Sequence, residues 1–495
     1  MLETSTAQRP GRVESITLTV LFAVLFASPL TVWAVRGIPD NSATKEERVA
    51  AAAPTLPTNL DTLRAWPDAT GAWFSDRYPA RGELLHLRGR LLYDIFGVSP
   101  VAAMRAGKDN WFFYTGQNSF EFYRGADLFE PEELDAWVKR FHAWRDWLAA
   151  RDVDFLLITP PDKHRVYSEF LPDNTEPVGE RTRLHQFLEA LAERTPVEFI
   201  DPNAAIFAAK PWGLLYFPLG VHWNDRGAFV AYTQAFEQLA AKYEGLAPHP
   251  IESFHVVDRA AIDPAWTGDS WSGRMHLGER LRQEAVQVVP KFPLPYAIVS
   301  FQPNRSGTID GVTRHIDPSL PRIVLVRDSF GDWFFPFVAL HASQLVSEGF
   351  IRHPVELVEL HRPDLLIHMR LENGLMEVPP DIRISEDEIK LARAWLAAEP
   401  LAGGDGAGAA FEPGVPRRFE NVAGPRGAVV RVEREPKGGA EVSVRLVLLD
   451  GSERTARVPV WDGWRWSFQI LEAWEGDADV EIACEGALGI ELRLR

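Results

Sequence analysis

Hydrophobic and polar positions follow strand-like and helix-like patterns in turn through the middle of the chain. Short apolar runs at residues 153–159, 322–327 and 365–369 predict buried strands. Residues 131–150 carry apolar side chains at three- and four-residue spacing, which predicts an amphipathic helix. Continuous apolar strands that alternate with helices are typical of a parallel sheet covered on both faces. We therefore predict a doubly wound α/β domain over residues 134–398.

The helix predicted at residues 131–150 has an aromatic stripe on one face. Trp137, Phe141 and Trp144 lie on the same face as Leu134 and Leu148. Such a stripe either packs into the core or offers a platform on which sugar rings stack. Its helical period favours the core.

The N-terminal part of the chain contains a long apolar run. Residues 16–35 carry no charge, and ~20 helical residues span ~30 Å, about the thickness of a bilayer core. Val32-Trp33-Ala34 puts a bulky residue where signal peptidase needs a small one. We therefore predict an uncleaved membrane anchor over residues 1–36 rather than a removed signal peptide. Residues 37–133 are expected to form a tether and the N-terminal part of the α/β region.

The C-terminal part has a different pattern. Residues 399–415 are rich in Gly and Ala and predict a flexible linker. Residues 416–495 contain short alternating runs separated by Asp-Gly turns, which predict a small antiparallel β-sandwich, a candidate carbohydrate-binding module. Trp461, Trp464 and Trp466 either stack on sugars or pack in the sandwich core.

Composition and charge narrow the range of functions. With 495 residues, the chain is expected to form two or three domains. A formal net charge of −17 argues against a nucleic-acid partner, because no long basic face is present to neutralise phosphates. The single cysteine, Cys484, excludes an internal disulfide framework and a cysteine-rich metal site. The histidines have no ligand spacing, so metal binding is not expected. No cofactor is predicted.

The apolar run at residues 322–327 leads into a turn that contains Ser329. A helix-like pattern follows this turn. A buried strand that delivers one serine to a tight turn before a helix is how many α/β enzymes present a nucleophile. The N–H groups of Ser329 and of the helix start are then placed to hold an oxyanion. The structural alternative is that Asp328 and Ser329 only cap an ordinary helix.

A second candidate for chemistry lies about a hundred residues upstream. His222 precedes Asn224, a residue type that often caps the first turn of a helix, and apolar positions follow at helical spacing. A histidine in a loop before a helix is placed to act as a general base, although a histidine beside a tryptophan is also common in packed cores. The pairing of His222 with Ser329 favours activated-nucleophile chemistry.

Several short motifs together resemble the alginate O-acetyltransferase family, which comprises AlgJ- and AlgX-like periplasmic proteins with an SGNH-hydrolase-like domain. Their order and spacing follow that family over residues 41–371. The motifs are Trp73-Phe74-Ser75-Asp76-Arg77 with Arg81; Gly107-Lys108-Asp109-Asn110-Trp111-Phe112-Phe113-Tyr114; Pro161-Asp162-Lys163 with Val166-Tyr167 and Leu171-Pro172; His222-Trp223-Asn224 with Gly227-Ala228; and Asp328-Ser329-Phe330.

The resemblance implies a periplasmic enzyme, held in the inner membrane by one N-terminal helix, that moves acetyl groups onto an exported polysaccharide. It implies that Ser329 is the nucleophile, which forms an acetyl-serine, and that His222 is the base. It also implies a partner that supplies the acetyl group, a multi-pass membrane O-acyltransferase.

The sequence departs from the family at the acid of the expected triad. The family has an aspartate two residues before the histidine, and this position is Gly220. Loss of that carboxylate costs orders of magnitude in rate in a triad. Three aspartates on neighbouring segments are candidate replacements: Asp162, Asp225 and Asp328. Two alternatives stay open: a catalytically impaired protein that binds or scaffolds polysaccharide, and a carbohydrate esterase.

Three further residues are candidates for contact with the sugar. Lys163 belongs to the Pro161-Asp162-Lys163 motif, and Trp223 follows the histidine. Arg327 occupies a position where the family commonly has glycine, so we expect it either to crowd the oxyanion side or to bind an acidic sugar.

Overall fold

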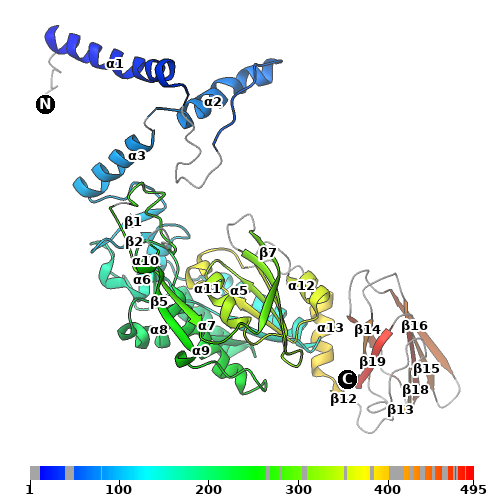
Figure 1. Ribbon diagram of the computed structural model, residues 1–495. Helices are drawn as coiled ribbons and strands as arrows, with labels where there is room; N and C mark the ends of the chain where they lie inside the picture. Colours follow the sequence, from blue (N-terminus) through cyan, green and yellow to red (C-terminus); the bar gives the residue numbers. More distant parts are fainter. Residues whose placement is uncertain are drawn as a thin grey trace, which may run out of the picture. The chain divides into compact units, whose positions relative to one another are not determined.

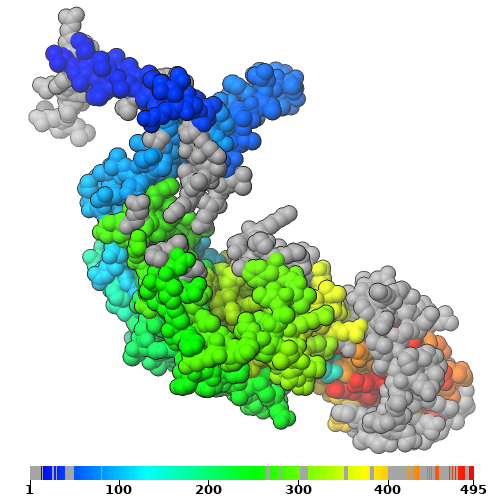
Figure 2. Space-filling model, in the orientation of Figure 1, coloured from blue at the N-terminus to red at the C-terminus, as the bar shows by residue number. Residues whose placement is uncertain are grey.

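The computed structural model of the chain is shown in Figures 1 and 2, in which the described residues are coloured. These residues are 12–38, 50–79, 81–263, 268–278, 280–303, 309–349, 354–379, 384–400, 417–422, 427–434, 441–448, 452–459, 466–471, 474, 478–484 and 487–494. The chain divides into two compact units, which are described one at a time. Unit 1 comprises Met1–Tyr114, Pro218–Gly220 and Ser270–Gln283, and unit 2 comprises Thr115–Phe217, Val221–Asp269 and Glu284–Arg495.

Unit 1 consists of helices followed by a short hairpin. Its elements are α1 (Arg12–Arg36), α2 (Leu60–Asp76), α3 (Arg81–Arg90), the π-helical turn η1 (Leu91–Ile95), β1 (Met104–Ala106) and β2 (Phe112–Tyr114). Helix α2 begins with a capping box, in which the side chains of Asn59 and Thr62 each bind the other's backbone N–H. Strands β1 and β2 pair antiparallel.

The apolar run at residues 16–35 lies in helix α1. Within the part of the chain that the structure describes, no helix combines the length and the apolar character that crossing a bilayer requires. The prediction of a transmembrane helix is therefore not supported.

Unit 2 is built on a seven-stranded sheet with the order β4-β3-β11-β9-β10-β8-β7. The five strands from β4 to β10 are parallel, as predicted. Strand β8 pairs antiparallel with both of its neighbours, β10 and β7, so the sheet is mixed and the prediction of a parallel sheet was incomplete. The strands are β3 (Asp154–Ile158), β4 (Glu198–Ile200), β7 (Tyr296–Pro303), β8 (Ile309–His315), β9 (Arg322–Arg327), β10 (Gln344–Gly349) and β11 (Leu365–Met369).

The antiparallel pairing of β7 with β8 follows from the short connection between these two strands. Only residues 304–308 separate β7 from β8 along the chain. So short a connection allows a hairpin, whereas a parallel neighbour needs a crossover of a dozen residues or more. Two more strands, β5 (Phe254–Asp258) and β6 (Val286–Pro290), form a separate antiparallel pair.

Helices lie between the strands in sequence and pack around the sheet. They are α4 (Ser119–Arg124), α5 (Pro131–Ala149), α6 (Lys163–Val166), α7 (Arg183–Arg194), α8 (Asn203–Ala209), α9 (Asp225–Ala240), α10 (Arg259–Ile262), α11 (Gly331–Val338), α12 (Pro354–His361) and α13 (Glu386–Ala397), with 3₁₀ turns η2 (Ser168–Phe170), η3 (Lys210–Trp212), η4 (Ile251–Ser253) and η5 (Glu372–Met376).

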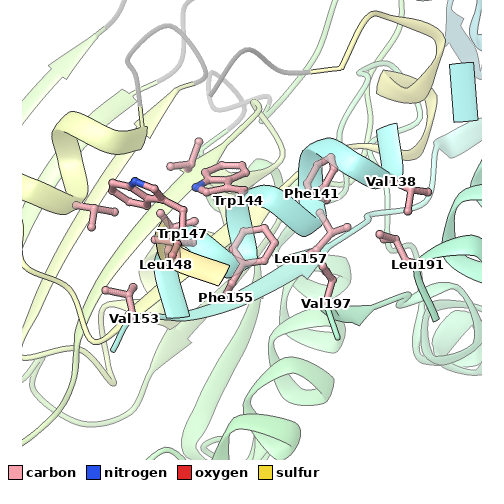
Figure 3. Close-up of a cluster of buried hydrophobic side chains, with 14 of the residues drawn as sticks. Val138, Phe141, Trp144, Trp147, Leu148, Val153, Phe155, Leu157, Leu191 and Val197 are labelled. Carbon is pink, nitrogen blue, oxygen red and sulfur yellow. The ribbon is translucent and has the colours of Figure 1, made fainter. Parts of the chain in front are cut away.

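The aromatic stripe of α5 lies in the core of unit 2. Trp137, Phe141 and Trp144 are fully buried and belong to a single hydrophobic cluster. In Figure 3, Phe155 and Leu157 of β3 lie beside Phe141 and Trp144 of α5. The prediction that this stripe packs into the core, rather than serving as a sugar platform, is confirmed.

The C-terminal strands form two four-stranded sheets. The sheet orders are β12-β19-β14-β17 and β13-β18-β15-β16, and every pair within them is antiparallel. One buried cluster takes side chains from both sheets, as predicted for a β-sandwich. The strands are β12 (Glu399–Pro400), β13 (Arg417–Val422), β14 (Ala428–Arg434), β15 (Glu441–Leu448), β16 (Glu453–Pro459), β17 (Trp466–Leu471), β18 (Ala478–Cys484) and β19 (Ala487–Leu494).

Strand β17 joins the sandwich to the core of the α/β body. Trp466 and Phe468 are buried in the same hydrophobic cluster as Trp395 of α13. Trp466 therefore packs in the core and is not a sugar platform. Trp461 and Trp464, the other two candidates, lie outside the described residues.

Candidate functional site

Ser329 lies in the turn between the central strand β9 and helix α11, as the sequence pattern predicts. Asp328 fixes this turn: its carboxylate accepts hydrogen bonds from Phe330 N (3.0 Å) and Leu371 N (2.5 Å). Gly331 allows the tight turn, because a Cβ atom there would lie 2.0 Å from Cδ of Arg327. The half-buried Ser329 is thus held by backbone geometry at the carboxyl end of a buried strand.

His222 lies at the end of a narrow two-stranded loop before helix α9. Tyr216 and Trp223 form an antiparallel bridge, and Phe217 N donates to His222 O at 3.1 Å. Asn224 caps α9, since its side chain accepts from Arg226 N at 2.9 Å. This confirms the predicted cap and fixes the backbone on both sides of the histidine.

The structure brings Ser329 and His222 together and adds a carboxylate, Asp269. The Nε2 atom of His222 is 2.6 Å from Oγ of Ser329. Its Nδ1 atom is 2.8 Å from Oδ2 of Asp269. These two contacts form a nucleophile–base–acid chain, the arrangement that activates serine in hydrolases and acyltransferases.

Asp269 is held by more than the imidazole. Its Oδ2 atom also accepts hydrogen bonds from Val221 N at 2.6 Å and from His222 N at 3.0 Å. Burial raises the pKa of Asp269, but the positive charge of protonated His222 and these hydrogen bonds outweigh burial and hold the pKa well below its usual range. The carboxylate is therefore ionised when the imidazole takes up a proton.

Sequence reasoning missed Asp269. It lies 47 residues after His222 in a loop that carries no recognisable motif. Gly268, just before it, has a φ of +59°, and a Cβ there would lie 2.5 Å from the ring of Phe217. A Gly-Asp pair with this backbone conformation is a signal for a constrained loop, but it does not indicate what the aspartate contacts.

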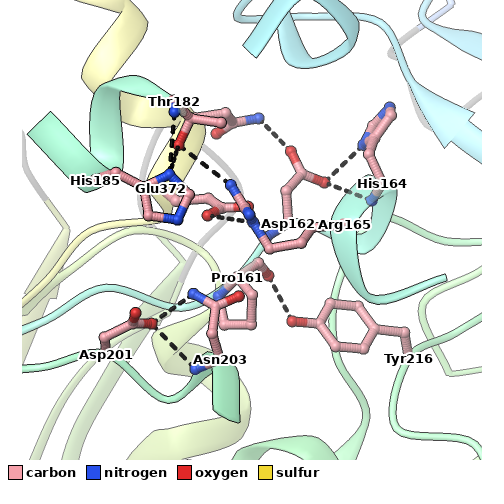
Figure 4. A network of polar contacts seen from close by, with 11 residues as sticks. Pro161, Asp162, His164, Arg165, Thr182, His185, Asp201, Asn203, Tyr216 and Glu372 are labelled. Carbon is pink, nitrogen blue, oxygen red and sulfur yellow. Dashed lines mark hydrogen bonds and ion pairs between the residues drawn. The ribbon is translucent and has the colours of Figure 1, made fainter. Parts of the chain in front are cut away.

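The three aspartates proposed from the sequence make other contacts. Figure 4 shows Asp162 beside His164, with an Oδ1–Nδ1 distance of 2.7 Å. Its other oxygen accepts from Asn373 Nδ2 at 2.6 Å. Burial raises the pKa of Asp162, but the neighbouring His164 outweighs burial and the pKa falls below its usual value. Asp162 thus belongs to a buried network of its own.

The other two aspartates also serve the local structure. Asp225 accepts a hydrogen bond from Val288 N at 2.9 Å, and burial raises its pKa to about 7. Asp328 holds the serine turn, and burial raises its pKa as well. No hydrogen bond among the described residues joins either side chain to the His222 ring, so the prediction that one of them orients the base is not borne out.

The three candidates for sugar contact are all buried. Trp223 donates from Nε1 to Phe330 O at 2.9 Å and so ties the base loop to the serine turn. Arg327 binds Ser347 Oγ and Asp332 Oδ1, each at 2.8 Å, and has 1% of its side chain exposed. Arg327 is therefore buried at the serine turn, where it forms an ion pair with Asp332.

Lys163 lies behind the base loop. Its Nζ donates to Phe217 O at 3.1 Å, and its side chain is buried. Burial lowers the pKa of Lys163 to about 7, and the charges of Asp269 and Asp162 counteract part of this effect. Lys163 supports the strand that presents His222.

The serine turn offers one N–H group to an oxyanion. Phe330 N donates to the Asp328 side chain, Gly331 N to Asp328 O (3.2 Å) and Asp332 N to Ser329 O (3.2 Å). Within the described residues, Ser329 N–H makes no hydrogen bond. It is the donor that the turn leaves available, while the next N–H groups stabilise the turn itself.

The described segments contain no group of three or more His, Cys, Asp or Glu side chains suited to hold a metal ion.

Comparison with known proteins gives a family match over part of the chain. Residues 104–288 match the family model of the SGNH hydrolase-like domain of the acetyltransferase AlgX. This segment contains His222 and Asp269, and Ser329 follows it. The match confirms the predicted resemblance to the AlgJ- and AlgX-like family. A search of curated proteins gives no match.

Solved structures give further similarities at low identity. Bacillus cereus PatB1 with a sulfonyl adduct is 13% identical, over 58% of this chain and 99% of that chain, with a TM-score of 0.42. The O-acetyltransferase domain of Pseudomonas putida AlgJ is 16% identical, over 59% and 99%, with a TM-score of 0.36. Pseudomonas aeruginosa AlgX is 13% identical, over 79% and 93%, with a TM-score of 0.35.

Proposed function

We propose that this protein transfers acetyl groups to hydroxyl groups of a polysaccharide. The starting point is the match of residues 104–288 to the SGNH hydrolase-like domain of the acetyltransferase AlgX. The observation that carries the proposal is the continuous chain from Ser329 Oγ through the His222 ring to Asp269, with distances of 2.6 and 2.8 Å. The match to this family supports the acetyl group and the sugar acceptor, whereas the geometry supports a covalent route.

In the first half-reaction, Ser329 Oγ attacks the carbonyl carbon of an acetyl donor. His222 Nε2 takes the hydroxyl proton as the Oγ–C bond forms, and Ser329 N–H donates to the oxyanion. The tetrahedral intermediate then collapses. The bond to the donor oxygen breaks, and His222 returns the proton to that leaving group. The product is an acetyl ester on Ser329.

In the second half-reaction, a sugar hydroxyl attacks the acetyl-serine. His222 takes the sugar proton, the new O–C bond forms, and Oγ leaves with the proton that His222 returns. Asp269 keeps the Nδ1–H tautomer in both halves and stabilises the ring while it is charged.

Asp269 also bears on the alternative of a catalytically impaired scaffold. That alternative was motivated by Gly220, which leaves the base without a carboxylate two residues away. Because Asp269 occupies the acid position, the departure at Gly220 no longer argues for loss of activity. An esterase would use the same three residues with water as the acceptor, so it is an outcome that the experiment below distinguishes.

The proposal also includes the cellular compartment of the reaction and the source of the acetyl group. The family resemblance supports an exported polysaccharide in the periplasm, with acetyl supplied by a multi-pass membrane O-acyltransferase.

The test uses the purified protein with a chromogenic acetyl ester and a soluble oligosaccharide acceptor. We expect an adduct of one acetyl group on Ser329 by intact mass, and acetylated oligosaccharide as product. Ser329→Ala should abolish the adduct, and His222→Ala should reduce its rate of formation by orders of magnitude. Acetate release without acetylated sugar would identify an esterase. No adduct and equal rates in all variants would refute catalysis at this site.

A further inference from the structure

A tryptophan on helix α11 lies flat against the base. The ring centroids of Trp333 and His222 are 4.6 Å apart, and the planes are inclined by 26°, which is a stacked arrangement. Phe330 contacts the same imidazole edge to face, at 5.1 Å and 61°. Phe217 packs on Trp333 at 5.8 Å, so the tryptophan is itself held in place. Trp333 touches neither the Asp269 end nor the Ser329 end of the hydrogen-bond chain in these contacts.

We propose that Trp333 is a positioning residue for the base, whose indole face holds the His222 ring in line between Ser329 and Asp269 and stabilises the imidazolium formed during the reaction. This inference rests on the proposed function for its role in catalysis, but the contact itself is independent of which acyl group is transferred.

The physical reason is the charge that the ring gains. His222 is neutral before attack and positive once it holds the serine proton. The face of an indole carries negative potential and attracts a cation placed over it, more strongly where water is excluded. The His222 side chain is only 16% exposed, so the attraction is weakly screened. The stack is therefore stronger while the ring is charged, alongside the tetrahedral intermediate, than in the resting state.

Three charged groups interact with the His222 ring or with its partner. Asp269 contacts the ring at Nδ1, and its carboxylate also accepts hydrogen bonds from two backbone N–H groups. Asp328, from the β9 side, interacts with the His222 charge at longer range, and Lys163 of α6 faces Asp269. Trp333, by contrast, is stacked on the face of the imidazole.

The link between nucleophile and base is also mechanical. Ser329 lies two residues before Gly331, the first residue of α11, and Trp333 lies in the first turn of that helix. One rigid segment therefore carries both the attacking oxygen and the surface against which the base rests. The attacking oxygen and the indole surface therefore keep a fixed relation to each other.

The experiment compares variants that keep or remove the π face. Trp333→Phe keeps an aromatic face, and Trp333→Leu keeps apolar bulk without it. We expect Trp333→Leu to reduce kcat roughly 3- to 30-fold with a smaller change in KM, and Trp333→Phe to retain most of the activity. In Trp333→Leu, the acid limb of the kcat/KM profile should move to lower pH, because the charged ring loses a stabilising contact. Trp212→Leu, which changes a half-buried tryptophan packed on Phe229, is the matched control and should leave the limb in place.

A second measurement does not depend on turnover. In a Ser329→Ala background, the midpoint of the His222 ring titration can be followed by NMR. This midpoint should move to lower pH in Trp333→Leu. It should also move to lower pH when a fluorinated tryptophan replaces Trp333, because fluorination keeps the shape of the ring but weakens its negative π face. If the midpoint stays fixed while activity falls equally in the Phe and Leu variants, Trp333 only fills space and the inference is overturned. A shifted midpoint in a protein without transferase activity would instead refute the proposed function and leave this inference standing.

Discussion

Asp269→Asn isolates the contribution of the acid that the fold supplies. Asparagine keeps the shape of the side chain but removes its charge, and its amide can present either an oxygen or an N–H group to Nδ1 of His222. The wild-type pair has an Oδ2–Nδ1 distance of 2.8 Å, with 14% of the Asp269 side chain exposed. A unit charge ~4 Å from the centre of the imidazolium is worth ~4 kcal/mol at an effective dielectric constant of about 20. At 1.36 kcal/mol for each factor of ten, we expect a roughly 10³-fold loss in kcat.

The assay is the rate of acetyl-serine formation from a chromogenic acetyl ester, with intact mass as a second readout. The KM should change far less than kcat, because the lost interaction is made mainly with the charged ring. Asp225→Asn is the matched control: it also replaces an aspartate that accepts a backbone hydrogen bond, but one with no bond to His222 among the described residues. If Asp269→Asn keeps more than about a tenth of the wild-type rate, the acid assigned by the structure is not the functional one.

Three further predictions concern buried charges. The pKa of Asp225 in the folded state is raised to about 7, so the folded protein binds more protons than the unfolded protein between about pH 4 and 7. The stability of the wild type should therefore fall as pH rises through this range. In thermal melts, Asp225→Asn should show a smaller fall in Tm over the same range. Lys163 has a lowered pKa of about 7 in the folded state, so the unfolded state binds more protons between about pH 7 and 10. The stability of the wild type should therefore rise over this range, whereas that of Lys163→Met should not. Lys163→Met should also transfer acetyl more slowly, because the strand before His222 loses the hydrogen bond from Lys163. Arg431→Met removes an ion pair with Glu491 (2.6 Å) and a hydrogen bond to Ala150 O (3.0 Å). Urea unfolding should therefore show a free energy of unfolding lower by about 1–3 kcal/mol. An unchanged urea midpoint would contradict the role of Arg431 in joining the sandwich to the α/β body.

The local pattern of apolar and polar residues was enough to predict the elements that carry Ser329 and His222. Strand β9, the serine turn and helix α11 follow from a β-branched apolar run, a polar turn and a helical period, all within a short stretch. Likewise, Asn224 marks the start of α9 and so places His222 in the preceding loop. The aromatic period of α5 identified a core face. These properties depend on neighbours within a few residues, which the sequence displays directly.

The burial of individual polar and aromatic side chains was harder to predict from the sequence than the secondary structure. Lys163, Arg327 and Trp223 have side chains suited to bind sugar, and each occupies a position next to the proposed chemistry. In the structure all three are buried, and each binds a backbone or side-chain group of the protein itself. Chemical type alone does not decide whether a polar side chain faces solvent, because that depends on what packs over it.

The triad shows the same division between sequence and structure. The sequence by itself determined that a serine would stand at the end of a buried strand, that a histidine would stand before a helix, and that the family's usual aspartate is absent at Gly220. Only the tertiary structure decided that Asp269 takes the place of that aspartate. The physical reason is that a 2.8 Å hydrogen bond between residues 47 positions apart depends on how the intervening chain returns to the site. The long-range packing of that chain sets the contact, and no local spacing records it.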